Sequence, residues 1–336
     1  MNSPAAFIDR VRTDVDSALE RLEQRTDPEA LYDPVRYVLS GGGKRFRPLL
    51  VHCAADMFDG DRRLALAAAL GVEVFHCFTL VHDDIMDGAK QRRGRPTVHV
   101  KWDEATAILC GDYLHGLSTE LLSEFPDGRL RTVLHLHSVA VRELCEGQVR
   151  DMEFESRPEV SLDDYLEMID LKTAALFRLS LKLGALSGTP TPDDLDLLDR
   201  IGGHLGRAFQ IQDDLLDLTA EAGSWGKAVG GDLVAGKKTW VSIAAASRAE
   251  SAASDAHDLP IDPARFARAL KTPGSFSLED VPSARDMMDR LGVLNDARSS
   301  VIFHSDEARK LLDQLPECVG REVLGDLTHR MQQRYH

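Results

Sequence analysis

The sequence predicts an all-α fold. Apolar residues recur every three to four positions in almost every segment, as in Val11, Val15, Leu19 and Leu22, and this spacing is typical of a helix with one face in a core. We find no apolar–polar alternation that would indicate a β-strand. At 336 residues, 43% of them hydrophobic, the chain can bury a sizeable core. No segment is long or biased enough to be a linker, so we expect a single domain over residues 1–336.

Breaks in this pattern place the helices. The glycine-rich stretch 40–48 opens a new helix, and Thr191 or Asp193 caps the helix that leads to residue 217. Helices or apolar helical stretches are expected at about 49–57, 64–86, 103–124, 129–154, 161–187, 193–217, 293–314 and 317–335. Loops and short helices are expected at 88–99, 223–238 and 255–285.

The composition excludes several classes of protein. The formal net charge of −15 disfavours a general nucleic-acid binder. The five cysteines are far apart and form no C-x-x-C pair, which argues against a zinc or redox motif and for reduced thiols in a cytosolic protein. Residues 1–12 do not have the form of a signal peptide. No apolar run approaches the roughly 18–20 residues that cross a bilayer, so we expect a cytoplasmic protein without a membrane span.

The pattern Asp-Asp-x-x-Asp occurs twice, each time at the end of a long apolar segment. Its members are Asp83, Asp84, Asp87, Asp213, Asp214 and Asp217. On a helix, positions i and i+4 share a face and i+1 flanks them, so each copy forms a carboxylate cluster. One copy alone would more often be a solvated face. Two copies would repel each other unless cations lay between them, and oxygen ligands without His or Cys suit Mg²⁺ with substrate phosphates. We therefore expect a metal-bridged phosphate site between two helices.

Basic residues supply groups for the anion. Three glycines precede Lys44 and Arg47 at the start of a helix, a setting that favours phosphate binding. Arg92 and Arg93 follow the first Asp motif and can fork onto diphosphate oxygens. His76 shares the helix face of Asp83. Further cations are Lys172, Lys227 and Lys237. Taken singly, each of these residues is as readily explained by a solvated side chain, a basic turn or a satisfied core histidine.

Together these motifs resemble the trans-isoprenyl diphosphate synthases of the polyprenyl synthetase family. The matching motifs, in order, are Gly-Gly-Lys44-Arg45-x-Arg47-Pro48, His82-Asp83-Asp84-x-x-Asp87 with Arg92-Arg93-Gly94-x-Pro96-Thr97, Lys172-Thr173, Phe209-Gln210-x-x-Asp213-Asp214-x-x-Asp217, and Gly226-Lys227-x-x-Gly-Gly-Asp232-Leu233-x-x-Gly236-Lys237-x-Thr239. A softer match is Gly147-Gln148-x-x-Asp151. The resemblance covers about residues 35–335.

The resemblance implies a helical bundle of the isoprenoid synthase type around a central active-site cavity. It also implies head-to-tail condensation of isopentenyl diphosphate with an allylic diphosphate such as dimethylallyl, geranyl or farnesyl diphosphate. Three Mg²⁺ ions would be held by Asp83, Asp87 and Asp213, with Asp84, Asp214 and Asp217 in support. The implied catalytic residues are Asp83, Asp84, Asp87, Asp213, Asp214, Lys172, Thr173, Gln210 and Lys227. The implied ligands of isopentenyl diphosphate are Lys44, Arg47, His76 and Arg93, and Arg92, Lys172, Lys227 and Lys237 would bind the allylic diphosphate. A homodimer is also implied, for which the helix at 103–124 is a candidate interface.

Product length is expected to depend on the helix before the first Asp motif. By resemblance, an aromatic residue at Phe78, followed by Thr79, indicates a short product tunnel. Asp84 and Asp87 lack the insertion found in many bacterial farnesyl enzymes. We therefore favour geranylgeranyl diphosphate, with farnesyl diphosphate or a longer product as alternatives. The sequence departs from the family pattern at Ala228 and at Trp240-Val241, neither of which removes a ligand.

Three other functions share some of these features. A class I terpene cyclase also uses an Asp-rich helix and Mg²⁺, and a squalene- or phytoene-type synthase is related in chemistry. Both are disfavoured because they lack the paired diphosphate sites implied by Lys44 to Arg47 and by Arg92-Arg93. A non-catalytic subunit of a heteromeric synthase would be expected to have lost one of the motifs, and this chain retains all of them.

Overall fold

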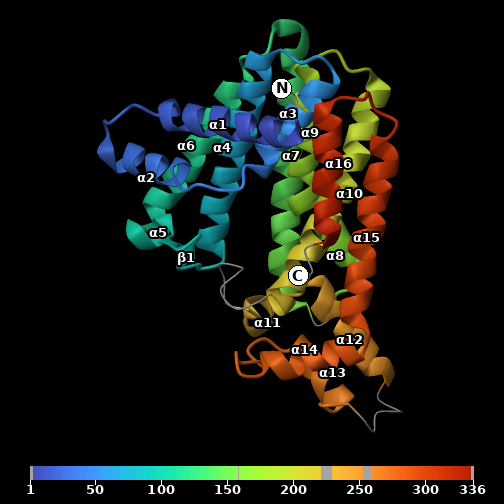
Figure 1. Ribbon diagram of the computed structural model, residues 1–336. Helices are drawn as coiled ribbons and strands as arrows, with labels where there is room; N and C mark the ends of the chain where they lie inside the picture. Colours follow the sequence, from blue (N-terminus) through green and yellow to red (C-terminus); the bar gives the residue numbers. More distant parts are fainter. Residues whose placement is uncertain (1–2, 158, 221–228, 253–258, 334–336) are drawn as a thin grey trace. The chain divides into compact units, whose positions relative to one another are not determined.

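The computed structural model describes residues 3–157, 159–220, 229–252 and 259–333, and this part of the chain is almost wholly helical (Figure 1). The prediction of an all-α fold is confirmed. The elements are α1 (Pro4–Leu22), α2 (Glu29–Leu39), α3 (Phe46–Met57), α4 (Arg62–Met86), β1 (Gln91–Arg92), β2 (Arg95–Pro96), α5 (Val98–Lys101), α6 (Glu104–Leu122), α7 (Asp127–Ser156), α8 (Leu162–Ile169), the π-helix η1 (Asp170–Ala174), α9 (Ala175–Leu186), α10 (Pro192–Thr219), α11 (Gly231–Ala235), α12 (Trp240–Ala252), α13 (Pro263–Lys271), α14 (Val281–Arg290), α15 (Val293–Leu312) and α16 (Val319–Gln333).

The chain forms two compact units. Unit 1 comprises Met1–Ala140, Leu176–Arg200 and Leu312–Asp326, and unit 2 comprises Val141–Ala175, Ile201–Leu311 and Leu327–His336. The chain passes between the units several times, so α7, α9, α10, α15 and α16 contribute residues to both. Our expectation of a single domain over residues 1–336 remains a prediction.

Helix α4 carries the first Asp motif in unit 1. It begins after Asp61, whose side chain accepts hydrogen bonds from the backbone N–H groups of Arg63 at 2.9 Å and Leu64 at 3.0 Å. This N-cap satisfies donors that the first turn leaves open. The helix ends at Met86, and the N–H of Asp87 bonds to the carbonyl of Asp83 at 2.8 Å. The acidic motif therefore occupies the last turn and C-cap of the helix.

Helix α4 also corrects one expectation from the sequence. Among the described residues it is long and apolar enough to cross a membrane, with a mean hydropathy of 2.0 over its most apolar window. We had expected no apolar run of that length. However, 78% of the window is buried inside the protein, and the core helices of soluble proteins have the same length and composition. One such helix is therefore weak evidence for a membrane span.

A π-helical turn interrupts the helix that we expected at 161–187. Residues 170–174 form η1 between α8 and α9, and η1 includes Lys172 and Thr173. Two glycines let neighbouring helices of unit 2 approach this turn. A Cβ atom at Gly147 would lie 2.5 Å from the backbone nitrogen of Lys172, and one at Gly206 would lie 2.4 Å from the Cβ of Ala174. Because π-turns often occur at functional sites, this irregularity draws attention to Lys172 and Thr173.

The loop expected at 88–99 contains a short β-hairpin. Strands β1 and β2 pair antiparallel, with Arg92 opposite Arg95, and Figure 1 shows β1 just beyond the end of α4. The turn residues Arg93 and Gly94 have φ values of 54° and 73°, as a two-residue type I′ turn requires. The expectation of no strand is wrong here, because strands of two residues are too short to produce an alternating pattern.

Candidate active site

A buried ion-pair network fixes the start of α3 in unit 1. Arg45 adopts a left-handed conformation with φ 49°, and its side chain is buried. Its guanidinium donates to Asp16 Oδ1 at 2.7 Å and to Glu73 Oε1 at 2.6 Å. Helices α1 and α4 thereby hold the residue that lies between two predicted ligands, Lys44 and Arg47. The structure thus assigns Arg45 a supporting position.

Arg47, on α3, and His76, on α4, lie next to each other in unit 1. Arg47 Nη1 is 3.1 Å from His76 Nε2, and the guanidinium lies over the ring of Phe177. Arg47 Nε is buried and has no hydrogen-bond partner among the described residues. Burial lowers the pKa of Arg47 to about 10; Glu73 opposes this effect and the nearby Arg93 adds to it. Burial first, and then Arg47 and Arg93, hold the pKa of His76 well below its ordinary value. The guanidinium groups of Arg47 and Arg93 therefore act on a neutral His76, with Glu73 near Arg47.

Arg93 lies over the glycine-rich stretch. Its Nη1 donates a hydrogen bond to the carbonyl of Gly42. A Cβ atom at Gly43 would lie 2.9 Å from the same nitrogen, and Gly43 has φ 149°. The sequence suggested that these glycines expose N–H groups to a phosphate. In the structure, the space over Gly43 is occupied by the guanidinium of Arg93. The glycines therefore bring Arg93 close to the segment that carries Lys44 and Arg47.

The first Asp motif divides into a buried and a more exposed part. Asp84 is buried, and its Oδ1 accepts a 2.7 Å hydrogen bond from Nε of Arg92. Burial raises the pKa of Asp84, and Arg92 opposes that rise. Asp83 is half-buried and Asp87 is exposed. Arg92 and Asp84 were expected to bind diphosphate and metal respectively, and here they bind each other.

Asp214 is the centre of a hydrogen-bond network in unit 2. Its Oδ2 accepts from the hydroxyl of Tyr165 and, at 2.8 Å, from the N–H of Trp240. Its Oδ1 accepts from Gln210 Nε2 at 3.1 Å, and Thr173 Oγ1 donates to Gln210 Oε1 at 3.0 Å. Burial raises the pKa of Asp214 to about 7, against the effect of these donors. The predicted residues Thr173, Gln210 and Asp214 are therefore connected in one chain of hydrogen bonds.

Tyr165 and the backbone of Trp240 were missed by the sequence analysis. Tyr165 is fully buried on α8, and in the sequence it looks like any core aromatic residue. Trp240 was noted only as a departure from the family pattern. Its contribution is a main-chain N–H at the start of α12, which depends on the fold and not on the side chain. Neither role has a sequence pattern by which it could have been found.

The other predicted residues of unit 2 have different surroundings. Asp217 is buried and accepts from the N–H of Asp232 at 3.0 Å. Lys172 Nζ lies 2.5 Å from Asp151 Oδ2. Asp213 is half-buried and Lys237 is exposed. Lys227 and the departure at Ala228 lie outside the described residues.

Phe78 lies in an aromatic cluster in unit 1. Its ring centroid is 4.9 Å from that of His82, 5.2 Å from His115 and 5.6 Å from Phe75. Thr79 is buried, and its hydroxyl donates to the carbonyl of His76 at 2.9 Å. Phe78 is therefore held from both α4 and α6. His115 is a contact that spacing along α4 could not have revealed.

The described residues contain no group of three or more His, Cys, Asp or Glu side chains arranged to hold a metal ion. In each motif, the buried carboxylates are bonded to protein donors. The more accessible ones are Asp83, Asp87 and Asp213. Mg²⁺ takes one or two carboxylates and completes its shell with substrate oxygens and water. The accessible carboxylates of each motif, taken by itself, therefore fit magnesium without forming a closed site.

An all-α fold with two Asp-rich helix ends and nearby basic side chains is the combination expected of an enzyme that acts on diphosphates. The family model for polyprenyl synthetase matches residues 28–261. The chain belongs to the polyprenyl synthetase family, and the prediction of an enzyme that transfers prenyl groups is confirmed.

Similar proteins have been characterised or solved in archaea. The chain is 37% identical to a geranylgeranyl diphosphate synthase of Methanosarcina mazei over 92% of this chain and 91% of that one. It is 36% identical to a geranylfarnesyl diphosphate synthase of Natronomonas pharaonis over 91% of each chain. The crystal structure of a geranylgeranyl pyrophosphate synthetase from Pyrococcus horikoshii superposes with a TM-score of 0.87 at 34% identity, covering 98% of this chain and 99% of that one.

Proposed function

We propose that the protein condenses isopentenyl diphosphate with an allylic diphosphate, head to tail, to form geranylgeranyl diphosphate. The observation that carries this proposal is the environment of Arg47. Its Nε is buried without a hydrogen-bond partner among the described residues, and it lies beside His76 and near Arg93. Glu73 offsets part of the charge of Arg47, but a buried guanidinium nitrogen without a hydrogen-bond partner still favours an anion that can accept from it. A diphosphate is such an anion, and guanidinium groups bind its oxygens in pairs.

We place isopentenyl diphosphate at this position, bound by Lys44, Arg47, His76 and Arg93. Because the pKa of His76 is held well below its ordinary value, its ring is neutral. A neutral imidazole can donate one N–H to the diphosphate without adding charge. Arg45 is held by Asp16 and Glu73, and it would thereby position Lys44 and Arg47 for the diphosphate.

The allylic diphosphate would be bound by Arg92, Lys172, Lys227 and Lys237. Magnesium would be held by Asp83, Asp87 and Asp213, while Asp84, Asp214 and Asp217 orient these helix ends from buried positions. Bound magnesium would stabilise the negative charge that develops on the departing diphosphate. Three ions per active site remain the number that the resemblance implies.

The chain's own residues would then act on the allylic cation. Hydroxyl and amide oxygens of Thr173 and Gln210 are fixed by their bond to each other and by Asp214. Oriented oxygen dipoles stabilise a developing positive charge without reacting with it. The double bond of isopentenyl diphosphate attacks the cation, and a proton is lost from the adduct to the released diphosphate. No nucleophilic side chain is required.

We infer the chain length of the product from the position of Phe78. This aromatic side chain, braced by His115 and His82, would close the product tunnel beneath the first Asp motif. A geranylfarnesyl product is the second candidate, because one relative of similar identity is named for it. We further propose a cytoplasmic homodimer that associates through α6, where Ile108 and Leu109 are exposed.

The test is to incubate the purified protein with farnesyl diphosphate, isopentenyl diphosphate and Mg²⁺ and to size the products by chromatography. Chain extension with release of diphosphate supports the proposal. A cyclised hydrocarbon would instead indicate a terpene cyclase, and inactivity rescued by a second protein would indicate a non-catalytic subunit. Arg47→Gln should raise KM for isopentenyl diphosphate by about tenfold or more. The surface variant Arg63→Gln is its control, because Arg63 pairs with Glu124 at an exposed position.

A further inference from the structure

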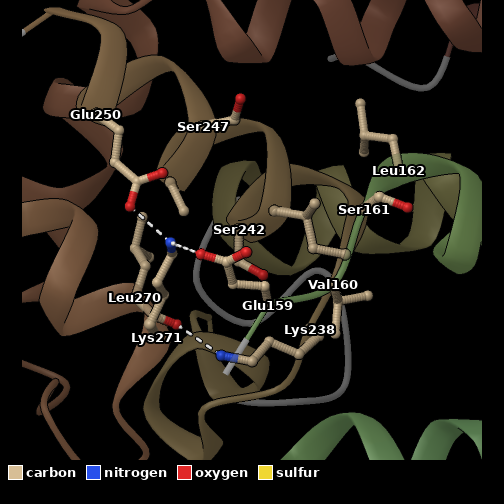
Figure 2. Close-up of a pocket in the computed structure, with 12 residues that line it drawn as sticks. Glu159, Val160, Ser161, Leu162, Lys238, Ser242, Ser247, Glu250, Leu270 and Lys271 are labelled. Atoms are coloured by element: carbon tan, nitrogen blue, oxygen red, sulfur yellow. Dashed lines mark hydrogen bonds and ion pairs between the residues drawn. The ribbon is translucent and has the colours of Figure 1, made fainter. Parts of the chain in front are cut away.

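A pocket of about 370 Å³ lies in unit 2, and none of the predicted site residues lines it. Figure 2 shows its three walls. They are the segment 159–162 at the start of α8, residues of α12 together with Lys238, and the last two residues of α13. The volume falls within the roughly 300–1,000 Å³ typical of small-molecule sites.

Much of the lining is apolar. Val160 and Leu162 lie on one wall, Ile243 and Ala246 on the second, and Leu270 on the third. These side chains come from three separate elements, so the apolar surface is not a single exposed helix face. A pocket of this kind removes hydrocarbon from water and therefore favours a ligand with an apolar body.

The two lysines of the pocket differ in whether a carboxylate lies close enough to neutralise their charge. Lys271 Nζ is 2.6 Å from Glu250 Oε1 and 3.5 Å from Glu159 Oε1. Lys238 Nζ donates only to the carbonyl of Leu270, at 3.1 Å, and has no carboxylate partner among the described residues (Figure 2). Burial lowers the pKa of Lys238, and the charge of Lys271 lowers it further. A half-buried ammonium group with one neutral acceptor can still bind an anion.

We propose that this pocket binds a small amphiphilic anion. Its carboxylate or phosphate head would bind the ammonium group of Lys238, and its hydrocarbon tail would pack against Val160, Ile243 and Leu270. Both carboxylates of the lining, Glu159 and Glu250, lie on Lys271, so a head group with a single anionic centre would bind at Lys238. The apolar part of the walls favours an occupant with a hydrocarbon tail over a purely polar ion such as inorganic phosphate.

The pocket is connected to a predicted substrate ligand. Lys238 lies between Lys237 and Thr239 in the chain. Ser242, which lines the pocket, accepts a 2.9 Å hydrogen bond from the N–H of Thr239, and its hydroxyl lies 3.1 Å from the carbonyl of Lys237. An anion that binds Lys238 and moves its side chain would also shift the segment 237–239. This coupling rests on the proposed function, in which Lys237 binds the allylic diphosphate.

Binding is tested by isothermal titration calorimetry on the Mg²⁺-loaded protein. The active site is first saturated with a non-reactive thiolo analogue of farnesyl diphosphate, so that it cannot take up the probe. Decanoate and decyl phosphate are then titrated, with decanol as the neutral control. We expect at least one of the anions to bind, and decanol to bind about tenfold or more weakly. A preference for decanoate indicates a fatty-acid type of ligand, and a preference for decyl phosphate indicates a prenyl- or alkyl-phosphate type.

Lys238→Met should weaken binding of the preferred anion about tenfold, whereas Lys238→Arg should retain it. Lys310→Met is the matched control, because Lys310 is an exposed lysine of α15 that pairs with Glu307. Thermal unfolding of each variant establishes that it is folded. Absence of binding by both anions, or equal binding by decanol or by Lys238→Met, overturns the proposed site.

The coupling is measured separately by steady-state kinetics. The preferred anion should raise KM for farnesyl diphosphate in the wild-type protein, leave KM for isopentenyl diphosphate unchanged, and have no effect on Lys238→Met. An equal rise in both KM values overturns the coupling and leaves the binding result intact. If the protein forms no prenyl product at all, the proposed function fails, while calorimetry still decides whether the pocket binds an anion.

Discussion

The hydroxyl of Tyr165 donates a hydrogen bond to Asp214 Oδ2 in the interior of unit 2. Two further donors, the N–H of Trp240 and the amide of Gln210, bind the same carboxyl group at 2.8 and 3.1 Å. Asp214 is therefore held from three directions by protein groups. Because its neighbour Asp213 is the more accessible residue, the network orients the end of the motif and leaves Asp213 as the better candidate for contact with metal.

Tyr165→Phe removes one of these donors and should be felt in two measurements. Loss of a hydrogen bond to a buried group lowers the free energy of unfolding by about 1–3 kcal/mol, which urea unfolding would measure. If Tyr165 positions the acidic motif, the Mg²⁺ concentration for half-maximal turnover should also rise. Tyr37→Phe is the control, since its hydroxyl donates to the carbonyl of Pro96 in unit 1. An unchanged Mg²⁺ dependence would leave Tyr165 with a purely structural role.

Asp83→Ala should reduce turnover by about 10²–10³-fold. Asp83 is half-buried in the last turn of α4, so its removal should alter the site more than the fold. Asp112→Ala, at an exposed position of α6, is the control and should leave turnover unchanged. Steady-state rates and Mg²⁺ titration would measure the effect. Near-normal turnover by Asp83→Ala would refute the metal role.

Phe78→Ala should lengthen the product. The substitution removes an aromatic ring that packs against His115 and His82, and the space it leaves would admit another isoprene unit. Chain-length chromatography of the products measures the change. Phe303→Ala serves as the control, because that ring is exposed on α15. If the Phe78 variant makes the same product as the wild type, Phe78 is not the end of the tunnel.

The fold class and most helix positions were accessible from the sequence because they depend on periodicity. Helices α6 and α10 lie close to where spacing and breaks placed them, and Thr191 caps α10 through a 3.2 Å bond from the N–H of Asp194. The π-turn at 170–174 was not accessible. It adds no polar or apolar residue out of pattern, and it depends on the close approach that Gly147 and Gly206 allow.

The candidate site shows the same division. Residue types and spacing identified Asp84 and Arg92, but not that they bind each other at 2.7 Å. That pairing depends on the hairpin turn that folds Arg92 back onto α4. Likewise, His115 could not be associated with Phe78 from the sequence, because the contact joins two helices. The residue types of the site could be predicted from the local sequence. The side chains that they contact could be found only from the tertiary structure.

His137 should make the protein less stable in mild acid. Its ring is buried against Phe75 and stacks on His115, and burial, assisted by the charge of His115, lowers its pKa from 6.5 to about 4. Between these values the unfolded chain binds a proton that the folded protein does not, so stability falls as pH falls. The full effect is up to about 3 kcal/mol.

The measurement is the free energy of unfolding from pH 7 to pH 4. His137→Gln should flatten the pH dependence relative to the wild type, because glutamine does not titrate in this range. His135→Gln provides a matched control on the same helix, since His135 is exposed. Parallel pH curves for the wild type and the His137 variant would contradict the assignment.

Leu109→Asp should dissociate the proposed dimer. Leu109 is 60% exposed on α6 beside Ile108, which is 43% exposed, and contiguous exposed apolar side chains are typical of protein–protein contacts. A carboxylate there would have to be buried unpaired in the interface, which is strongly unfavourable. Sedimentation velocity at micromolar concentration measures the change. Leu278→Asp is the matched control, because Leu278 is 58% exposed in unit 2. A wild-type monomer would contradict the homodimer itself, and a Leu109→Asp dimer as stable as the Leu278→Asp dimer would place the interface elsewhere.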